Sequence, residues 1–186
     1  GNYLSSENFG LSLKMDKVSL QNLNLSNERF NLKGVLDLNL DMKRSYSNNS
    51  LKFNGSLDDF EMNHMKMGSL LFFTSGNTKL NSYEVNMLLS HQGNTTMSAK
   101  GNILSFDQSP RLDLDFSFDD FDLSFLTPIG AGDIDEIRGK VSGDINLWGP
   151  LYSPKHNGEL ILNEGGLRVP DINTNYKISN GTRVSL

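Results

Sequence analysis

The chain contains no cysteine among its 186 residues, which excludes a disulfide framework and any thiolate nucleophile or metal ligand. Hydrophobic residues make up only 37% of the sequence. No apolar run approaches the roughly eighteen residues that a membrane-spanning helix needs. The formal net charge is −5, so the chain has neither the basic face of a nucleic-acid-binding protein nor the positive charge that favours an anionic membrane surface.

Motifs for catalysis are absent as well. His64, His91 and His156 are isolated in the sequence and have no paired-ligand spacing. Asp113 and Asp115 alternate with apolar residues, which is typical of the hydrated face of an amphipathic strand and not of a pair of catalytic carboxylates. No serine lies in a nucleophile elbow, and no glycine-rich phosphate loop occurs. We therefore expect no catalytic residues, no metal site and no cofactor.

The dominant pattern is an alternation of apolar and polar residues with a period of two, which predicts β-strands along most of the chain. The run Leu112, Leu114, Phe116, Phe118 is its most regular example. We expect about a dozen strands, mostly antiparallel, with less than about a tenth of the residues helical. The side chains predicted to form one apolar face are Leu36, Leu38, Leu40, Phe53, Leu57, Val85, Met87, Leu89, Leu112, Leu114, Phe116, Phe118, Val141, Ile145, Leu147, Leu160 and Leu162.

A weak repeat places a glycine before each of several alternating segments, as in "SAKGNILSF" and "KVSGDINLW". These glycines are Gly34, Gly55, Gly101, Gly143 and Gly158. Each lies on the apolar parity of its strand, where the absence of a side chain usually marks a bend or the close approach of another group. Two interpretations stay open: ordinary turn and bulge glycines, or points at which long strands bend to curl a sheet into a trough.

Only the segment 127–138 has a pattern that predicts a helix, because Pro128 comes early and acidic residues follow it. We expect one or two helical turns there. The parity of the alternation also flips after Phe118, which predicts a bulge or a bend at Asp119–Asp120. With so few helices to cover the apolar faces, the sheet must close on itself, pack on a second sheet or leave a groove. Met62, Met65 and Met67 fit a packed core and a flexible binding surface equally well.

The stretch "GDINLWGPLYSPKHNGELILNEGG", from Gly143 to Gly166, reads as strand, turn, strand. Pro150 and Pro154 lack backbone donors, so we expect both in the connection. Residues from about 116 to 178 resemble the TamB and AsmA-like families, whose pattern includes G-x-x-x-G-x-[IL]-x-[LVF]-x-G. The matching positions here are Gly139, Gly143, Ile145, Leu147, Gly149, Pro154, Gly158, Leu160, Leu162, Val169, Pro170, Tyr176 and Ile178.

The resemblance implies an all-β fold: a long, curled, mostly antiparallel sheet that forms an open trough (a β-taco) with an apolar concave face. It implies that residues 1–186 are one β-rich segment of a larger, repeat-like periplasmic protein, anchored in the inner membrane through a segment outside this chain. It also implies a non-enzymatic role, in which phospholipid acyl chains move along the groove between the inner and outer membranes. That role would support outer-membrane biogenesis and protein translocation and assembly. An Omp85-type outer-membrane barrel is the expected partner of the full-length protein.

Two other architectures remain open from the residues alone. One is a structural or adhesive β-sandwich without a groove, and the other is a closed barrel of about eight to ten strands that binds one small ligand. In a continuous sheet, the strand near Leu186 is expected to be an open edge and to pair with another copy of the chain.

Overall fold

The computed structural model describes residues 9–26, 31–44, 49–77, 82–104, 110–130 and 133–186. These residues form eleven strands of one antiparallel sheet and three short 3₁₀ helices. The strands are β1 (Phe9–Ser19), β2 (Leu32–Arg44), β3 (Asn49–Met62), β4 (Met65–Asn77), β5 (Ser82–His91), β6 (Asn94–Leu104), β7 (Arg111–Asp122), β8 (Asp135–Pro150), β9 (Lys155–Val169), β10 (Thr174–Lys177) and β11 (Thr182–Ser185). The 3₁₀ helices are η1 (Leu20–Leu23), η2 (Ser124–Gly130) and η3 (Pro170–Ile172).

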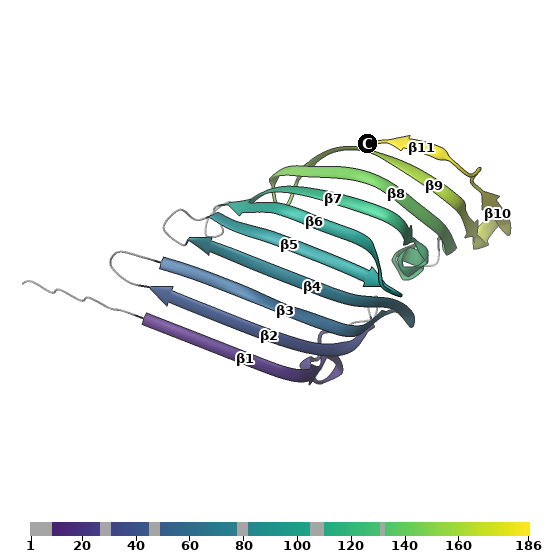
Figure 1. Ribbon diagram of the computed structural model, residues 1–186. Helices are drawn as coiled ribbons and strands as arrows, with labels where there is room; N and C mark the ends of the chain where they lie inside the picture. The colour runs from purple at the N-terminus through teal and green to yellow at the C-terminus, as the bar shows by residue number, and fades with distance from the viewer. Residues whose placement is uncertain (1–8, 27–30, 45–48, 78–81, 105–109, 131–132) are drawn as a thin grey trace, which may run out of the picture.

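The strands follow one another in sequence order across the sheet, so every connection from β1 to β10 joins antiparallel neighbours. β10 and β11 both pair with β9, at Leu167–Tyr176 and Leu160–Val184 for example, and act as two halves of one interrupted strand. β1 and β10 lie at opposite ends of the strand order, so the sheet is open. Figure 1 shows that it curls from β1 towards β11. The predicted all-β, open-trough class is confirmed.

Bulges in β1, β3, β7 and β9 explain part of the curl, because a bulge bends its strand and increases the local twist. Each contains a residue with a left-handed backbone: Lys17, Asp59, Asp120 and Glu164. The N–H of Asp120 donates to Ser142 Oγ at 2.9 Å, so a side chain on the next strand satisfies the donor that the bulge removes from the ladder. In the same way, the backbone N–H of Lys17 donates to Asp37 Oδ1 of β2 at 3.0 Å. The predicted bulge at Asp119–Asp120 is confirmed.

The predicted helical turns in 127–138 are wrong in extent. The observed element η2 is a 3₁₀ helix over Ser124–Gly130, residues 131–132 lie outside the described ranges, and β8 begins at Asp135. Asp135 pairs with Arg168 of β9, so pairing across the sheet outweighs the weak local tendency of a short acidic segment to start a helix.

The hairpin from Gly143 to Gly166 is observed as predicted, with one correction. Pro154 lies in the connection, but Pro150 is the last residue of β8 and pairs with Arg111. A proline is tolerated at that position because the ladder ends there and needs no further N–H donor. The Pro150 carbonyl accepts a hydrogen bond from the N–H of Ser153 at 3.1 Å, which closes the turn.

Candidate functional site: one apolar face of the sheet

The strand register places the apolar side chains in rows that cross the sheet perpendicular to the strands. One row reads Met15, Leu38, Gly55, Phe72, Met87, Ala99, Phe116, Ile145 and Gly158, from β1 to β9. A second reads Leu36, Leu57, Leu70, Leu89, Met97, Phe118, Gly143, Leu160 and Val184, from β2 to β11. Neither row contains a charged residue, so an apolar strip runs continuously over nine strands.

Two further rows complete this face. One contains Leu13, Leu40, Phe53, Thr74, Val85, Gly101, Leu114, Leu147 and His156, and the other contains Met42, Leu51, Gly76, Tyr83, Ile103, Leu112 and Gly149. Beyond the β7 bulge, Val141 pairs with Phe121 and Leu162. The register therefore brings all seventeen predicted side chains to one face, hereafter the apolar face.

The apolar face also contains residues that the alternation did not reveal. Leu70 and Phe72 of β4 contribute to two of the rows, but they occur in the sequence "LLFF", where either parity could face inward. Their neighbours Leu71 and Phe73 are 53% and 45% exposed on the opposite face. Only pairing with β3 and β5 decides between the two parities, so no local signal identifies these residues.

Four of the five predicted glycines lie where the backbone of a neighbouring strand leaves no space for a Cβ. A Cβ on Gly101 would be 2.0 Å from the carbonyl oxygen of Asp113, and a Cβ on Gly55 would be 2.2 Å from that of Asp37. Gly143 of β8 and Gly158 of β9 have the same relation to carbonyl oxygens of each other's strand, those of Glu159 and Asp144, at 2.2 Å each. Gly34 lies at an irregularity of the β2–β3 register. These positions leave no room for a side chain.

Two buried clusters divide the apolar face. Cluster 1 consists of Leu20, Leu36, Leu38 and Leu57. Leu20 belongs to η1, so this 3₁₀ helix covers the beginning of the face. Cluster 2 consists of Met67, Leu89, Phe121 and Val141, with Met62 and Met65 packed against it. The three methionines of the sequence cluster therefore contribute to packing.

The second 3₁₀ helix, η2, packs on cluster 2. The ring of Phe125 meets that of Phe121 edge-on at 5.4 Å between centroids, and the hydroxyl of Thr127 donates to the carbonyl of Ile137 at 3.3 Å. Figure 1 shows η2 beside the end of β7, on the inner side of the curled sheet. The helices η1 and η2 follow β1 and β7, two strands that run in the same direction across the antiparallel sheet, so both helices cover the same end of the apolar face.

At the other end of the strands, the apolar face is hollowed. A pocket of about 350 Å³ is lined by Leu51, Phe53, Thr74, Tyr83, Val85 and Ile103, of which Phe53 and Val85 were predicted. Phe53 stacks on Phe72 at 5.2 Å between ring centroids, at the inner margin of this hollow. The volume lies within the range of roughly 300–1,000 Å³ that is usual for small-molecule sites. Its almost wholly apolar lining suits a hydrocarbon chain.

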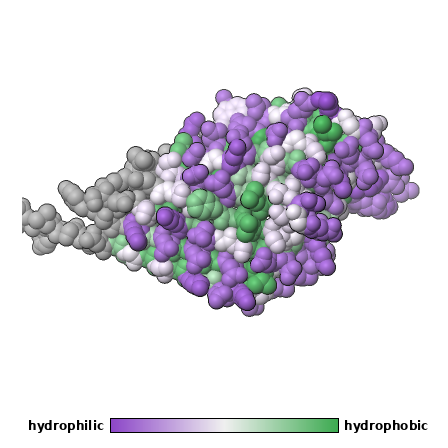
Figure 2. Space-filling model, in the orientation of Figure 1, coloured by the Kyte–Doolittle hydropathy of each residue, from purple (hydrophilic) through white to green (hydrophobic). Residues whose placement is uncertain are grey.

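The opposite face of the sheet is mostly polar, apart from exposed side chains such as Leu71, Phe73 and Leu88. Asp113 and Asp115 are both exposed, and the side-chain amide of Asn146 donates to Asp115 Oδ1 at 2.9 Å. Lys33 and Glu61 pair at 2.7 Å across β2 and β3, and this hydrogen bond lowers the pKa of the Glu61 carboxyl below its usual value. Figure 2 shows mainly hydrophilic and intermediate side chains on the side that it presents, with hydrophobic ones between them.

Across the described ranges, no group of three or more histidine or acidic residues is arranged to hold a metal ion. No helix within them is long and apolar enough to cross a membrane.

A family model described as the TamB C-terminal domain matches residues 86–185, more than half of the 186 residues. The chain belongs to the TamB family. The TamB match begins within β5 and runs to the end of β11, so it includes more of the sheet than the residues 116–178 in which the motif is clearest. No curated protein and no solved structure matches the chain. TamB-family proteins are envelope proteins of bacteria that serve in transport and assembly, and no enzymatic activity is ascribed to them.

Proposed function

We propose that this chain is a non-enzymatic segment of a periplasmic bridge that carries phospholipid between the inner and outer membranes. The observation that supports the proposal is the set of apolar rows that cross nine strands on one face. Acyl chains laid across the strands would meet methyl, methylene and aromatic groups all along this path. Membership of the TamB family is consistent with such a role.

The openness of the sheet favours this function over a structural or adhesive β-sandwich. In a sandwich, a second sheet packs about 10 Å from the first and fills the space between the two apolar faces. All described strands here belong to one sheet, and the described elements that pack on its apolar face, η1 and η2, lie at one end of it. In the full-length protein, the segment would be held at the inner membrane by another part of the chain and would act together with an Omp85-type barrel.

Lipid analysis tests the proposal directly. The protein is purified from bacterial membranes without detergent, extracted with organic solvent and examined by mass spectrometry. We expect co-purified phospholipid in amounts comparable to the protein, because several side chains of the apolar rows, Leu114 and Phe116 among them, are only half-buried. Protein that is free of lipid, and that takes up none from phospholipid vesicles, would contradict the proposal.

The open edges of the sheet predict self-association. β1 is an unpaired edge of eleven residues, and Phe9, Leu11 and Leu13 on it are 49%, 46% and 41% exposed. The strand near Leu186 is also an edge, as the sequence predicts, but β10 and β11 have only four residues each. Because unpaired backbone groups on a long apolar edge are templates for another strand, we expect copies to associate through β1.

Leu11→Lys should shift the sedimentation profile from oligomer to monomer, because an edge lysine opposes pairing. Leu71→Lys is the matched control, because Leu71 is 53% exposed but lies on β4, which is paired with a strand on each side. The control should associate like the parent chain. Equal dissociation of both variants would show that β1 is not the contact.

A further inference from the structure

The hollow lies at the end of the strands opposite η1 and η2, hereafter the open end, and it arises because small residues interrupt two of the apolar rows. One row has Thr74 on β4 and Gly101 on β6, and the next row has Gly76 on β4. A Cβ on Gly76 would lie 2.4 Å from Cδ1 of Tyr83, so the tyrosine ring lies against this glycine and forms part of the floor. Tyr83 is 9% exposed, whereas the other lining side chains are half-buried. The small residues therefore leave a depression between the larger side chains of β3 and β6.

The length of the hollow matches that of one acyl chain. Its lining runs from Leu51 and Phe53 on β3 to Ile103 on β6. Three strand spacings of about 4.8 Å make this distance roughly 14 Å. The hydrocarbon core of a bilayer is about 30 Å thick and contains two layers of acyl chains, so one chain extends over roughly 15 Å. A chain that fills the hollow would lie across the strands, in the direction of the apolar rows.

The lining provides contacts for hydrocarbon and no charge for a headgroup. None of its six residues is charged, and its polar groups are the hydroxyls of Thr74 and Tyr83. The nearby charged residues Lys52 and Glu84 lie on the opposite face of the sheet, where both pair in register with Ser75. Binding in the hollow would therefore come from the burial of apolar surface, which has no directional preference.

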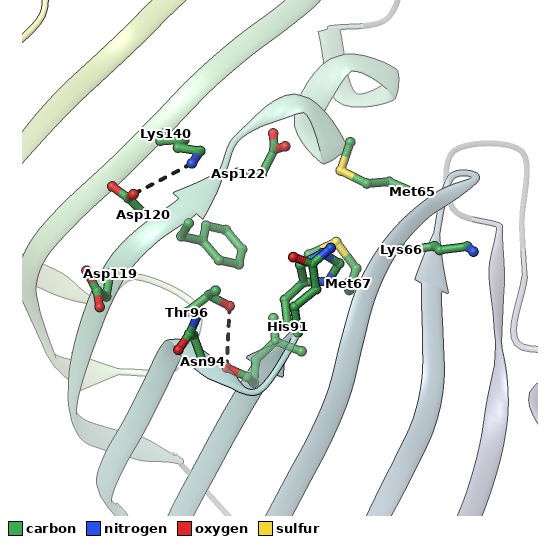
Figure 3. A pocket seen from close by; sticks show the side chains of 13 residues that line it. Met65, Lys66, Met67, His91, Asn94, Thr96, Asp119, Asp120, Asp122 and Lys140 are labelled. Carbon is green, nitrogen blue, oxygen red and sulfur yellow. Dashed lines mark hydrogen bonds and ion pairs between the residues drawn. The ribbon is translucent and has the colours of Figure 1, made fainter.

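A second cavity, of about 440 Å³, lies at the other end of the strands and is less suited to hydrocarbon (Figure 3). Acidic residues of β7 line it, and one of them, Asp120, pairs with Lys140 at 3.6 Å. Its apolar residues, such as Met67 and Phe121, belong to the packed cluster 2. An acyl chain in this cavity would take charged groups out of water, which is costly. The hollow at the open end has no such cost.

We propose that the hollow is a resting site for one acyl chain of a phospholipid and that it accepts the chain whatever headgroup the lipid carries. The inference rests on the proposed lipid-carrying function, and it names the residues at which a chain is held and the part of the lipid that they recognise. The second chain of the lipid lies along the apolar rows, and the headgroup stays in water at the open end of the strands.

Photocrosslinking of the whole chain tests the site. Phosphatidylethanolamine and phosphatidylglycerol, each with a photoactivatable group in one acyl chain, are supplied in separate vesicles, and the crosslinked peptides are identified by mass spectrometry. We expect crosslinks at Phe53, Thr74, Val85 and their neighbours in the hollow. The two lipids should agree in yield within about twofold, because specificity requires a contact that differs between them and the lining has none for a headgroup.

Thr74→Phe fills the hollow and should lower the crosslinking there about tenfold, the loss expected when roughly two methylene groups are no longer buried. Ser75→Phe is the matched control, because Ser75 is also half-buried but its side chain lies on the opposite face. The control should crosslink like the parent chain. Urea denaturation establishes that both variants are folded, and the positions of the crosslinks in the parent chain decide the question if Thr74→Phe is not.

The outcomes separate the two proposals. If the parent chain takes up no labelled phospholipid, the proposed function fails. If it takes up phospholipid, but the crosslinks lie outside the hollow or a folded Thr74→Phe lowers them no more than Ser75→Phe, only the resting site is refuted. A clear preference for one of the two phospholipids would overturn the independence from the headgroup.

A free fatty acid with the same photoactivatable group distinguishes the two sources of an acyl chain. We expect it to crosslink at the same residues as the phospholipids, because the lining contacts only the chain. If the fatty acid crosslinks in the hollow and the phospholipids do not, the hollow binds free fatty acid, and its assignment to a phospholipid is overturned.

Discussion

Leu114→Arg is expected to leave the sheet folded and to block lipid uptake, whereas Leu38→Arg is expected to unfold the chain. The two leucines belong to the same predicted face, but their surroundings in the structure differ. Leu38 is 8% exposed within cluster 1, together with Leu20 of η1. Leu114 is half-buried and belongs to neither cluster.

The difference follows from where the guanidinium can go. At Leu38 it would be buried without a partner, which costs about 3–5 kcal/mol. At Leu114, which lies in a row between Gly101 and Leu147, the long side chain can extend along the open face until its charge reaches water. We expect a loss of less than about 1 kcal/mol there. A charge on the path of acyl chains should still lower the lipid content about tenfold or more.

Urea denaturation measures both stabilities, and lipid extraction measures the content of the folded variant. The same Leu114→Arg change in the full-length protein should make the outer membrane permeable in cells. If Leu114→Arg unfolds the chain as Leu38→Arg does, the face around Leu114 is a packed core. If it is stable and retains normal lipid, the apolar rows are not the path.

The sequence predicts the repetitive part of this molecule well, because a period of two reports directly which side chains share a face of a strand. The run Leu112 to Phe118 lies on one face of β7 as expected, and the flip of parity at Asp119–Asp120 corresponds to an observed bulge. The prediction of an open trough comes from the resemblance to the family motif, because the alternation alone fits a β-sandwich equally well.

Features that depend on partners distant in sequence were not predictable. The sequence "LLFF" in β4 does not show which of its side chains belong to the apolar face, and only pairing with β3 and β5 decides this. The element η1 can be recognised only from the packing of Leu20 in cluster 1. The acidic stretch that resembles a helix start becomes β8, because β9 supplies hydrogen-bond partners. The gap between the start of β4 and the end of β7, beyond the tip of the β5–β6 hairpin, depends on the relative lengths of four strands, which no local pattern encodes.

The glycine repeat can be tested by one substitution with two controls. Gly101→Ala should lower the free energy of unfolding by roughly 2–5 kcal/mol, from backbone strain and overpacking together. Its φ of +146° disfavours any side chain, and the new Cβ would lie 2.0 Å from the Asp113 carbonyl oxygen and 2.9 Å from Leu114 Cα. Both contacts are with backbone, so β6 and β7 would have to separate in the middle of the apolar face.

The controls separate steric contact from backbone strain. Gly93→Ala has a positive φ of +84° at the tip of a hairpin but nothing within 4 Å of its Cβ, so it should cost about 1–2 kcal/mol. Gly10→Ala has neither problem and should be neutral or stabilising by up to about 1 kcal/mol. Urea denaturation of the three variants should therefore give the order Gly10, Gly93, Gly101 in increasing loss. If Gly101→Ala loses no more than Gly93→Ala, the β6 and β7 backbones can separate at little cost, and the repeat glycines are ordinary bulge residues that do not shape the trough.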